Sequence, residues 1–245
     1  MHFTDLIAPL SLDEFARRTK AGEYFVIEGN TQKFKHLITL EDIEKRLNDG
    51  CNFNIGTEII GGGKRGILLD EKIPWSNTSL KKREMKALLE GGHSFLMRNQ
   101  SQINRPVAAL IDSLENHIQH ARADVHLYVS PKGGGTGYNA HRDRPQHKIY
   151  LQVIGSTTWK IFTIVGPLDD HAVAVEEADE AQYLKEEAEF VLKPGDMFYM
   201  PPAVFHKVRN HHGPRVSISI PFTIMQGSPR MDRTFIPFKD IFESA

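Results

Sequence analysis

Two histidines and one aspartate, His141, Asp143 and His206, have the residue types of a metal site. His141 and Asp143 are two residues apart, between the glycine-rich segment 133–137 and the alternating apolar segment 148–154. In an extended chain, residues two apart face the same side, so the imidazole and the carboxylate can point into one cavity. A chain with 12 histidines and 31 acidic residues contains a His-x-Asp/Glu motif about once by chance. The segments around His141 and Asp143 therefore decide whether they are candidate metal ligands.

The third residue, His206, follows two turn segments, Pro194–Asp196 and Met200–Pro202. These turns predict one short strand between them and another that begins near His206. Two histidines and one carboxylate leave three positions open on an octahedral ion, which is the ligand set of non-haem Fe(II) oxygenases. Zinc prefers four closed positions, or three ligands and a water, and suits this set less well. The ligand types therefore favour a catalytic iron site.

The sequence from residue 124 onward favours a β-barrel that could hold these ligands. Its hydrophobic spacing changes from a helical period to alternation, and Gly, Pro, Asn or acidic stretches separate the alternating runs. Many short strands with turns between them are typical of a jelly roll or a related barrel. An acidic segment, 175–187, interrupts the strands and is predicted to be a solvent-exposed helix or loop. The predicted strands cover residues 124–130, 148–154, 157–164, 189–192, 197–200, 205–208 and 215–222.

The first half of the chain predicts helices and a few strands that pack around this barrel. Ser11 and Thr39 each begin a short helix as its N-cap, with acidic residues in the first turn. Segment 23–28 is rich in β-formers, and residues 106–123 predict a long helix with one apolar face. The polar segment 70–104 is predicted to be rich in loops, with one helix over residues 79–89.

The composition is that of one soluble globular domain. No linker divides the chain, so we expect a helical lead-in with outer strands, the core jelly roll and a tail, at residues 1–123, 124–223 and 224–245. With 30 basic and 31 acidic residues, no field of one charge sign favours nucleic acid or a membrane. The single Cys51 excludes an internal disulfide and fits a reducing compartment. Without a secretory signal or a long apolar run, we expect a cytoplasmic protein.

Three motifs in order, His141-x-Asp143, Gly155-x-x-x-Trp159 and Pro194-Gly-Asp-Met-Phe-Tyr-Met-Pro-x4-His206, carry a resemblance to a known family. Together they resemble the JmjC/cupin-like Fe(II)/2-oxoglutarate-dependent oxygenases. Segments 25–29 and 94–114 are similar to the N-terminal portion of the ribosomal-oxygenase-like (cupin_4) branch. The resemblance implies a mainly β fold, a double-stranded β-helix with flanking helices. We expect the C-terminal winged-helix and dimerisation regions of that branch to be lacking here.

The resemblance also implies roles for individual residues. His141, Asp143 and His206 would bind Fe(II) as the catalytic centre, with 2-oxoglutarate chelating the metal and one position left for O2. The distal carboxylate of 2-oxoglutarate needs a cation or hydroxyls inside the barrel. In the family pattern that cation stands two residues after Gly155, where this chain has Thr157.

Other residues could replace the missing cation. Arg215 and Ser217 resemble the Arg-x-Ser motif that other 2-oxoglutarate enzymes carry on the last barrel strand, where Arg can form a two-point fork. Lys148 competes for this role, because with Tyr150 and Gln152 it shares one face of its strand at a position similar to one that lines the cosubstrate pocket. Tyr138 matches a position that often hydrogen-bonds the cosubstrate. We favour Arg215 for the distal carboxylate.

The expected function is hydroxylation of a C–H bond in an amino-acid side chain of a protein, a peptide or a free amino acid, with O2 as oxidant. An oxygenase of a small metabolite is an alternative, and so is a metal-dependent cupin enzyme that does not use 2-oxoglutarate. Such cupins usually carry His-x-His, and Asp143 stands in the place of the second histidine. We expect no nucleic-acid or membrane partner, and a homodimer is compatible with the sequence.

Overall fold

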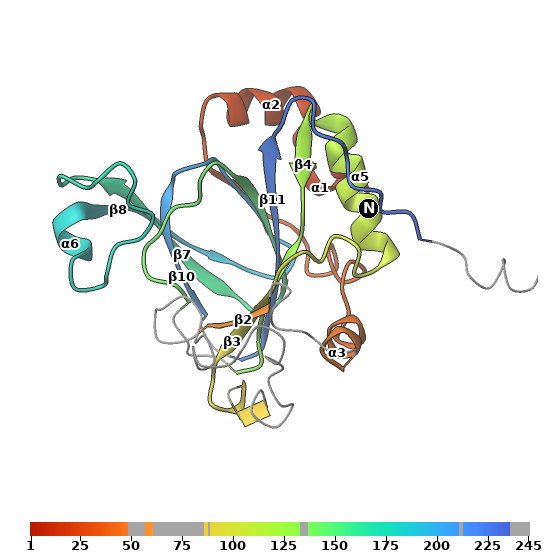
Figure 1. Cartoon of the computed structure of the whole chain (residues 1–245), viewed down its shortest axis with the longest axis horizontal. Coiled ribbons are helices and arrows are strands. Elements are labelled where there is room, and N and C mark those ends of the chain that lie inside the picture. The colour runs from red at the N-terminus through yellow and green to blue at the C-terminus, as the bar shows by residue number, and fades with distance from the viewer. Residues whose placement is uncertain (49–56, 61–85, 88, 133–136, 211–212, 236–245) are drawn as a thin grey trace, which may run out of the picture.

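A large antiparallel sheet and a smaller one form the centre of the molecule (Figure 1). The computed structural model describes residues 1–48, 57–60, 86–87, 89–132, 137–210 and 213–235. In this part of the chain the large sheet has the order β1-β9-β6-β11-β5-β3-β2, with β4 beside β11. Its strands are β1 (Phe25–Ile27), β2 (Thr57–Ile60), β3 (Ser94–Met97), β4 (Ala121–Ala123), β5 (His126–Ser130), β6 (His147–Ile154), β9 (Met197–Met200) and β11 (Arg215–Ile224). The smaller sheet, in the order β10-β7-β8, contains β7 (Thr157–Ile164), β8 (Leu184–Leu192) and β10 (Phe205–Asn210).

Alternation along the strands gives the large sheet an apolar outer face and a mixed inner face. On β6, Ile149, Leu151 and Val153 pack into the core that lies beneath the helices. Tyr150, between them, packs with Trp159 of the smaller sheet instead. The two sheets therefore face each other, which confirms the predicted jelly roll and places any interior site between them.

Helices cover the outer face of the large sheet (Figure 1). They are α1 (Phe3–Ile7), α2 (Leu12–Lys20), α3 (Leu40–Asn48) and α5 (Arg105–His117), whereas α6 (Glu180–Tyr183) lies with β8 on the opposite side. The two predicted N-caps are confirmed: Ser11 Oγ accepts a hydrogen bond from Glu14 N, and Thr39 Oγ1 accepts one from Asp42 N, both at 3.1 Å. No helix of the described residues is long and apolar enough to cross a membrane.

The predicted helix over residues 106–123 is wrong at its C-terminal end. Helix α5 ends at His117, and His120 adopts a left-handed backbone with φ of 61°. The next residues form β4, which pairs with the end of β11. Glu115 Oε1 accepts a hydrogen bond from Ala123 N at 2.8 Å and ties the strand to the helix. Pairing with a distant strand, which the local pattern does not encode, overrides the helical spacing here.

Two other predictions need correction. Segment 70–104, predicted to be rich in loops, contains β3, which pairs with β5 inside the large sheet. Most of the helix predicted over residues 79–89 lies outside the described residues. The acidic segment 175–187 is only partly a surface excursion, because its last residues belong to β8. Strand β8 alternates exposed acids with less exposed residues on the edge of the smaller sheet, so its composition resembles that of a loop.

The turn between β6 and β7 depends on Gly155. Its φ is 68°, and a Cβ at this position would lie 2.2 Å from the carbonyl oxygen of Pro214. Glycine adopts this conformation without strain, and only a residue without a Cβ allows so close an approach. The turn therefore packs against the chain just before Arg215 and fixes where β11 begins.

Residues 225–235, which follow the barrel, are fastened to α5. Arg233 is 4% exposed and pairs with the buried Glu115 at 3.1 Å and with Asp112 at 3.0 Å. Its guanidinium also donates to Ala123 O at 2.8 Å. A buried ion pair of this kind is held in place by its hydrogen bonds, and removing one partner leaves the other charge unpaired.

Candidate metal centre

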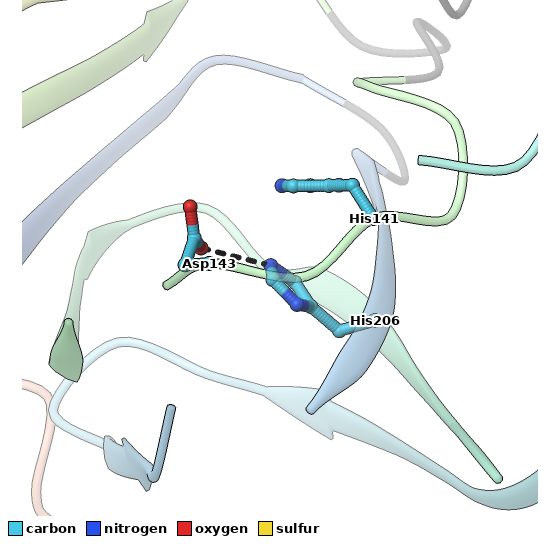
Figure 2. Close-up of side chains that lie close together, drawn as sticks. All are labelled: His141, Asp143 and His206. Carbon is cyan, nitrogen blue, oxygen red and sulfur yellow. Dashed lines mark ion pairs between the residues drawn. The ribbon is translucent and has the colours of Figure 1, made fainter. Parts of the chain in front are cut away.

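The side chains of the three predicted ligands lie close together (Figure 2). His206 belongs to β10, and His141 pairs with it in an isolated bridge, with N–H···O distances of 3.0 and 2.8 Å. The imidazole centroids are 4.2 Å apart, and the ligand atoms of all three residues lie within 4.8 Å of one another. Asp143 joins them from a loop that Ala203 N anchors by donating to Asp143 O. Residues 141–143 form no regular strand, and isolated bridges from His141 to His206 and to Ala174 hold its backbone instead.

Both imidazoles are held in a form that can bind a metal. His141 Nδ1 lies 2.9 Å from Asn139 O, and His206 Nδ1 lies 3.1 Å from Val204 O. A carbonyl only accepts hydrogen bonds, so each Nδ1 carries the proton and each Nε2 offers a lone pair. Burial, helped by the neighbouring His141, lowers the pKa of His206 to about 3, which keeps its ring neutral at pH 7. His206 is therefore ready to act as a ligand without losing a proton.

The carboxylate of Asp143 is ionised despite its burial. Burial alone would raise its pKa, but Lys148 and the two histidines outweigh that effect and lower the pKa to about 2. Lys148 Nζ lies 2.6 Å from Asp143 Oδ2, and both side chains are largely buried, with 6% and 13% exposed. Within the described residues, Oδ2 has no hydrogen-bond donor besides this ion-pair partner.

These donors fit a divalent cation. Two imidazole rings and one carboxylate converge. The buried Asp143 Oδ2 has no hydrogen-bond donor besides Lys148. Two imidazoles and one carboxylate on one side of an ion are typical of non-haem iron sites, and they leave positions for other ligands. His141, Asp143 and His206 would hold the metal.

A chain of buried polar side chains starts at Arg215 on the inner face of β11. Arg215 Nε donates to Ser217 Oγ at 2.9 Å, and Ser217 Oγ donates to Gln152 Oε1 at 2.8 Å. Thr157 Oγ1 donates to the same Gln152 oxygen at 3.1 Å and accepts from Trp159 Nε1 at 3.0 Å. The Thr157 hydroxyl is thus engaged within the barrel wall, whereas the guanidinium nitrogens of Arg215 beyond Nε remain for another partner.

Arg215 and a metal ligand line the same small cavity. Tyr138, Tyr128 and His141 share its wall with Arg215, whose guanidinium carbon lies 5.5 Å from the Tyr128 ring centroid. Burial lowers the pKa of Arg215 to about 10, so the side chain stays charged at pH 7. No carboxylate of the described residues pairs with it. The cavity has about 30 Å³, so a larger ligand would displace the side chains that line it.

Lys148 and Tyr150 lie on the inner face of β6, on the same side of the strand as Gln152. Lys148 contacts Asp143, and the buried Tyr150 packs against Trp159 with ring centroids 4.4 Å apart. Burial raises the pKa of Tyr150 well above its usual value, which keeps the phenol protonated. The predicted residues thus divide into Arg215, Ser217 and Tyr138 near His141, and Lys148 near Asp143.

Three residues of the site had no role predicted from the sequence. Gln152 joins the Arg215 network to Thr157, and Tyr128 lines the cavity. His126, on β5, is buried and its pKa falls to about 3 because of burial and the nearby Lys148. Alternation along β5 places His126 and Tyr128 on one face, and pairing this face with the site in β6 and β11 would have identified them.

The excursion, residues 165–183, is fastened to the segment that carries His141. Arg142 N donates to Val173 O at 2.9 Å, and the Arg142 guanidinium donates to the carbonyls of Asp170 and Ala172, both at 2.7 Å. The same guanidinium lies 4.8 Å from the centroid of the Phe205 ring. Because Arg142 follows His141, it faces away from the ligands and holds the excursion from outside.

Lys207, which follows His206 in the chain, also fastens the excursion to the metal centre. Lys207 is 3% exposed and pairs with Glu180 at 2.8 Å and with Glu177 at 3.0 Å. Both acids belong to the acidic segment that the sequence assigned to exposed structure. Two buried cations, each next to a histidine ligand in the chain, therefore fix the excursion to the outside of the metal centre.

Comparison with known proteins identifies the family. The family model described as JmjC domain matches residues 96–228, which include all three ligands, Lys148 and Arg215. The chain belongs to this JmjC domain family. A comparison with curated proteins finds no match.

Solved structures with a similar fold come from Escherichia coli YcfD. One YcfD structure, described as a ribosomal oxygenase in complex with cobalt and 2-oxoglutarate, has a TM-score of 0.61 and 14% identity, covering 96% of this chain and 65% of that one. Another YcfD structure has a TM-score of 0.59 and 15% identity, covering 89% and 54%. The chain thus spans about half to two thirds of the length of these structures. Likeness at this identity establishes the fold.

Proposed function

We propose that the protein is an Fe(II)- and 2-oxoglutarate-dependent oxygenase that hydroxylates a C–H bond. The observation that carries this proposal is the shared cavity: a ligand of the metal centre and a buried cation without a carboxylate partner line it together. 2-Oxoglutarate has a keto acid at one end and a carboxylate at the other, so it suits a pocket with a metal at one end and a guanidinium at the other.

Each residue of the pocket would have a separate task. His141, Asp143 and His206 would hold the iron, and Arg215 would pair with the distal carboxylate in a two-point fork. Ser217 already accepts from Arg215 Nε and so aims the guanidinium. Tyr138 lines the same cavity and offers a hydroxyl. Thr157 would contribute through Gln152 and not by direct contact, because its hydroxyl is engaged there.

When bound, the iron would supply the redox chemistry that couples O2 and 2-oxoglutarate to hydroxylation, with succinate and CO2 as the products. The chain's own part is to keep the ligands neutral or anionic as required, to orient the cosubstrate and to exclude water. Trp159 contributes to the last of these, because it stacks on His206 with centroids 5.6 Å apart and planes inclined by 17°. Tyr150, neutral and packed on Trp159, closes the same wall.

For the target we propose an amino-acid side chain in a protein or peptide. Support comes from the fold shared with YcfD, whose structures are described as those of a ribosomal oxygenase. A free amino acid or a small metabolite remains the alternative. We also propose that the protein forms a homodimer and is located in the cytoplasm.

An anaerobic titration tests the cofactors. Iron-loaded protein should develop a visible charge-transfer band when 2-oxoglutarate is added, and O2 should then release succinate. His206→Ala, which keeps the barrel but removes one ligand, is the matched control and should give neither signal. A folded, iron-loaded protein that gives no band with 2-oxoglutarate would refute the proposal and favour a cupin enzyme with another cosubstrate.

A further inference from the structure

Lys148 is a charged side chain in direct contact with Asp143, and the roles proposed above leave it unused. Its Nζ lies 2.6 Å from Asp143 Oδ2. The side chain comes from the inner face of β6, where Tyr150 and Gln152 are its neighbours on the same face. Only 6% of the side chain is exposed, so this contact is not a loose surface pair.

The contact matters because it involves an atom that a metal would need. Asp143 Oδ2 also lies 3.8 Å from His206 Nε2, so this oxygen faces the other ligands. A divalent cation bound by the same carboxylate meets the ammonium of Lys148 at short range, and in a buried site their repulsion is weakly screened. Without a metal, the ammonium compensates the charge of the carboxylate, which would otherwise be costly to bury.

Arg215 adds a second positive charge on the inner face, beside His141. A divalent cation that enters alone therefore adds positive charge near both cations, Lys148 beside Asp143 and Arg215 beside His141. A dianionic ligand that enters with the metal offsets this charge. The negative charge of the cosubstrate thus removes the electrostatic repulsion that opposes metal binding.

We propose that Lys148 couples metal binding to 2-oxoglutarate binding, by pairing with Asp143 while the centre is empty and by disfavouring a divalent cation that arrives without the dianion. The inference rests on the proposed function for its second ligand, whereas its first half concerns the metal alone. Coupling between two ligands is reciprocal, so 2-oxoglutarate strengthens metal binding by the same factor as the metal strengthens 2-oxoglutarate binding. Lys148 sets a large part of that factor.

Calorimetric titration of the metal-free protein with Co(II), with and without saturating 2-oxoglutarate, tests this role. Lys148→Met keeps the length of the side chain and removes the charge. We expect it to bind Co(II) alone about ten-fold tighter than the natural chain, because the repulsion and the competing pair are both gone. We expect 2-oxoglutarate to strengthen Co(II) binding less in this variant than in the natural chain.

Two controls separate charge from structure. Lys148→Arg keeps the charge and should retain the weak binding of Co(II) alone. Lys160→Met removes a lysine on β7 that pairs with Glu186 and Glu189 on the outer side of the smaller sheet, and it should titrate like the natural chain. Lys148→Gln, which keeps a donor toward Asp143 without charge, should behave as Lys148→Met and replaces it if the methionine variant folds poorly.

Thermal denaturation gives a readout independent of activity. Metal-free Lys148→Met should melt below the natural chain, since Asp143 loses its counterion, and Co(II) should raise its melting temperature by more. Equal or weaker binding of Co(II) alone by Lys148→Met and Lys148→Gln would overturn the inference. If 2-oxoglutarate leaves Co(II) binding unchanged in the natural chain, the proposed function fails, while the titrations with metal alone still decide the role of Lys148.

Discussion

Replacing Arg215 by methionine separates two explanations of a buried cation. If Arg215 serves stability, its removal should weaken the fold. If it serves an anionic ligand, its removal should abolish binding of that ligand and leave the ligand-free protein as stable as before. The structure favours the second outcome, because Arg215 is 7% exposed and pairs with no carboxylate among the described residues.

The size of each effect follows from the contacts. A hydrogen bond to a charged group contributes about 1.5–3 kcal/mol, so a guanidinium fork on a carboxylate should contribute about 3 kcal/mol, or about 100-fold in affinity. The ligand-free protein loses the hydrogen bond to Ser217, about 1 kcal/mol, and the contact with Tyr128. It also loses the penalty of burying an unpaired charge, which is at least as large. The free energy of unfolding should therefore stay the same or rise.

The assay compares 2-oxoglutarate binding to Co(II)-loaded protein by calorimetry with urea denaturation of the metal-free protein. Lys148→Met is the internal comparison, and it should weaken 2-oxoglutarate binding less than Arg215→Met. Ser217→Ala should lie between Arg215→Met and the natural chain, because it removes the group that aims the guanidinium. A folded Arg215→Met variant that binds 2-oxoglutarate normally, or is destabilised by more than about 2 kcal/mol, would refute the reasoning.

Three other changes have defined outcomes. Asp143→Asn removes the anionic ligand and should weaken Co(II) binding by more than about 100-fold, the loss expected when a residue that only supports a ligand is replaced. Quenching of tryptophan fluorescence measures this affinity, and a smaller loss would place the metal elsewhere. His126→Phe removes a histidine whose pKa is about 3 in the folded protein and 6.5 in the unfolded chain. Between these two pH values the unfolded state binds one more proton, so the free energy of unfolding decreases as the pH falls. The natural metal-free protein should thus lose about 2 kcal/mol more than this variant between pH 7 and pH 5 in urea titrations, and parallel curves would contradict the shift. Arg233→Met leaves Glu115 buried and unpaired and should cost about 3–5 kcal/mol in thermal denaturation, part of which Glu115→Gln should restore in the double variant.

The barrel and its candidate ligands could be predicted from the sequence because their signals are local. Alternation and turn residues mark β6, β7 and β11, and the ligand types stand in order along the chain. The helix that ends at His117 shows the limit: residues 118–123 continue its apolar spacing, yet β11 captures the last of them as β4. A partner more than 90 residues away decides their structure, and no local pattern contains it.

The surroundings of the centre were harder to predict for a related reason. Lys148 lies on the predicted face of its strand, but its contact with Asp143 depends on the path of the loop between them. Gln152 was visible as a neighbour of Tyr150, whereas its link to Ser217 requires the pairing of β6 with β11. Which side chains share a face follows from alternation, and which faces meet does not.

The outward-facing cations beside the histidine ligands have a consequence for protein engineering. Arg142 and Lys207 each follow a ligand by one position, so the strand geometry that points a histidine inward points a cation into the excursion. The excursion and the ligand-bearing segments therefore form one transplantable unit. A designer who shortens the excursion, or grafts it onto another barrel, must carry Arg142, Lys207 and Glu180 with it, or replace both cations by neutral residues. Otherwise two buried charges lose their partners next to the residues that must keep the tightest geometry.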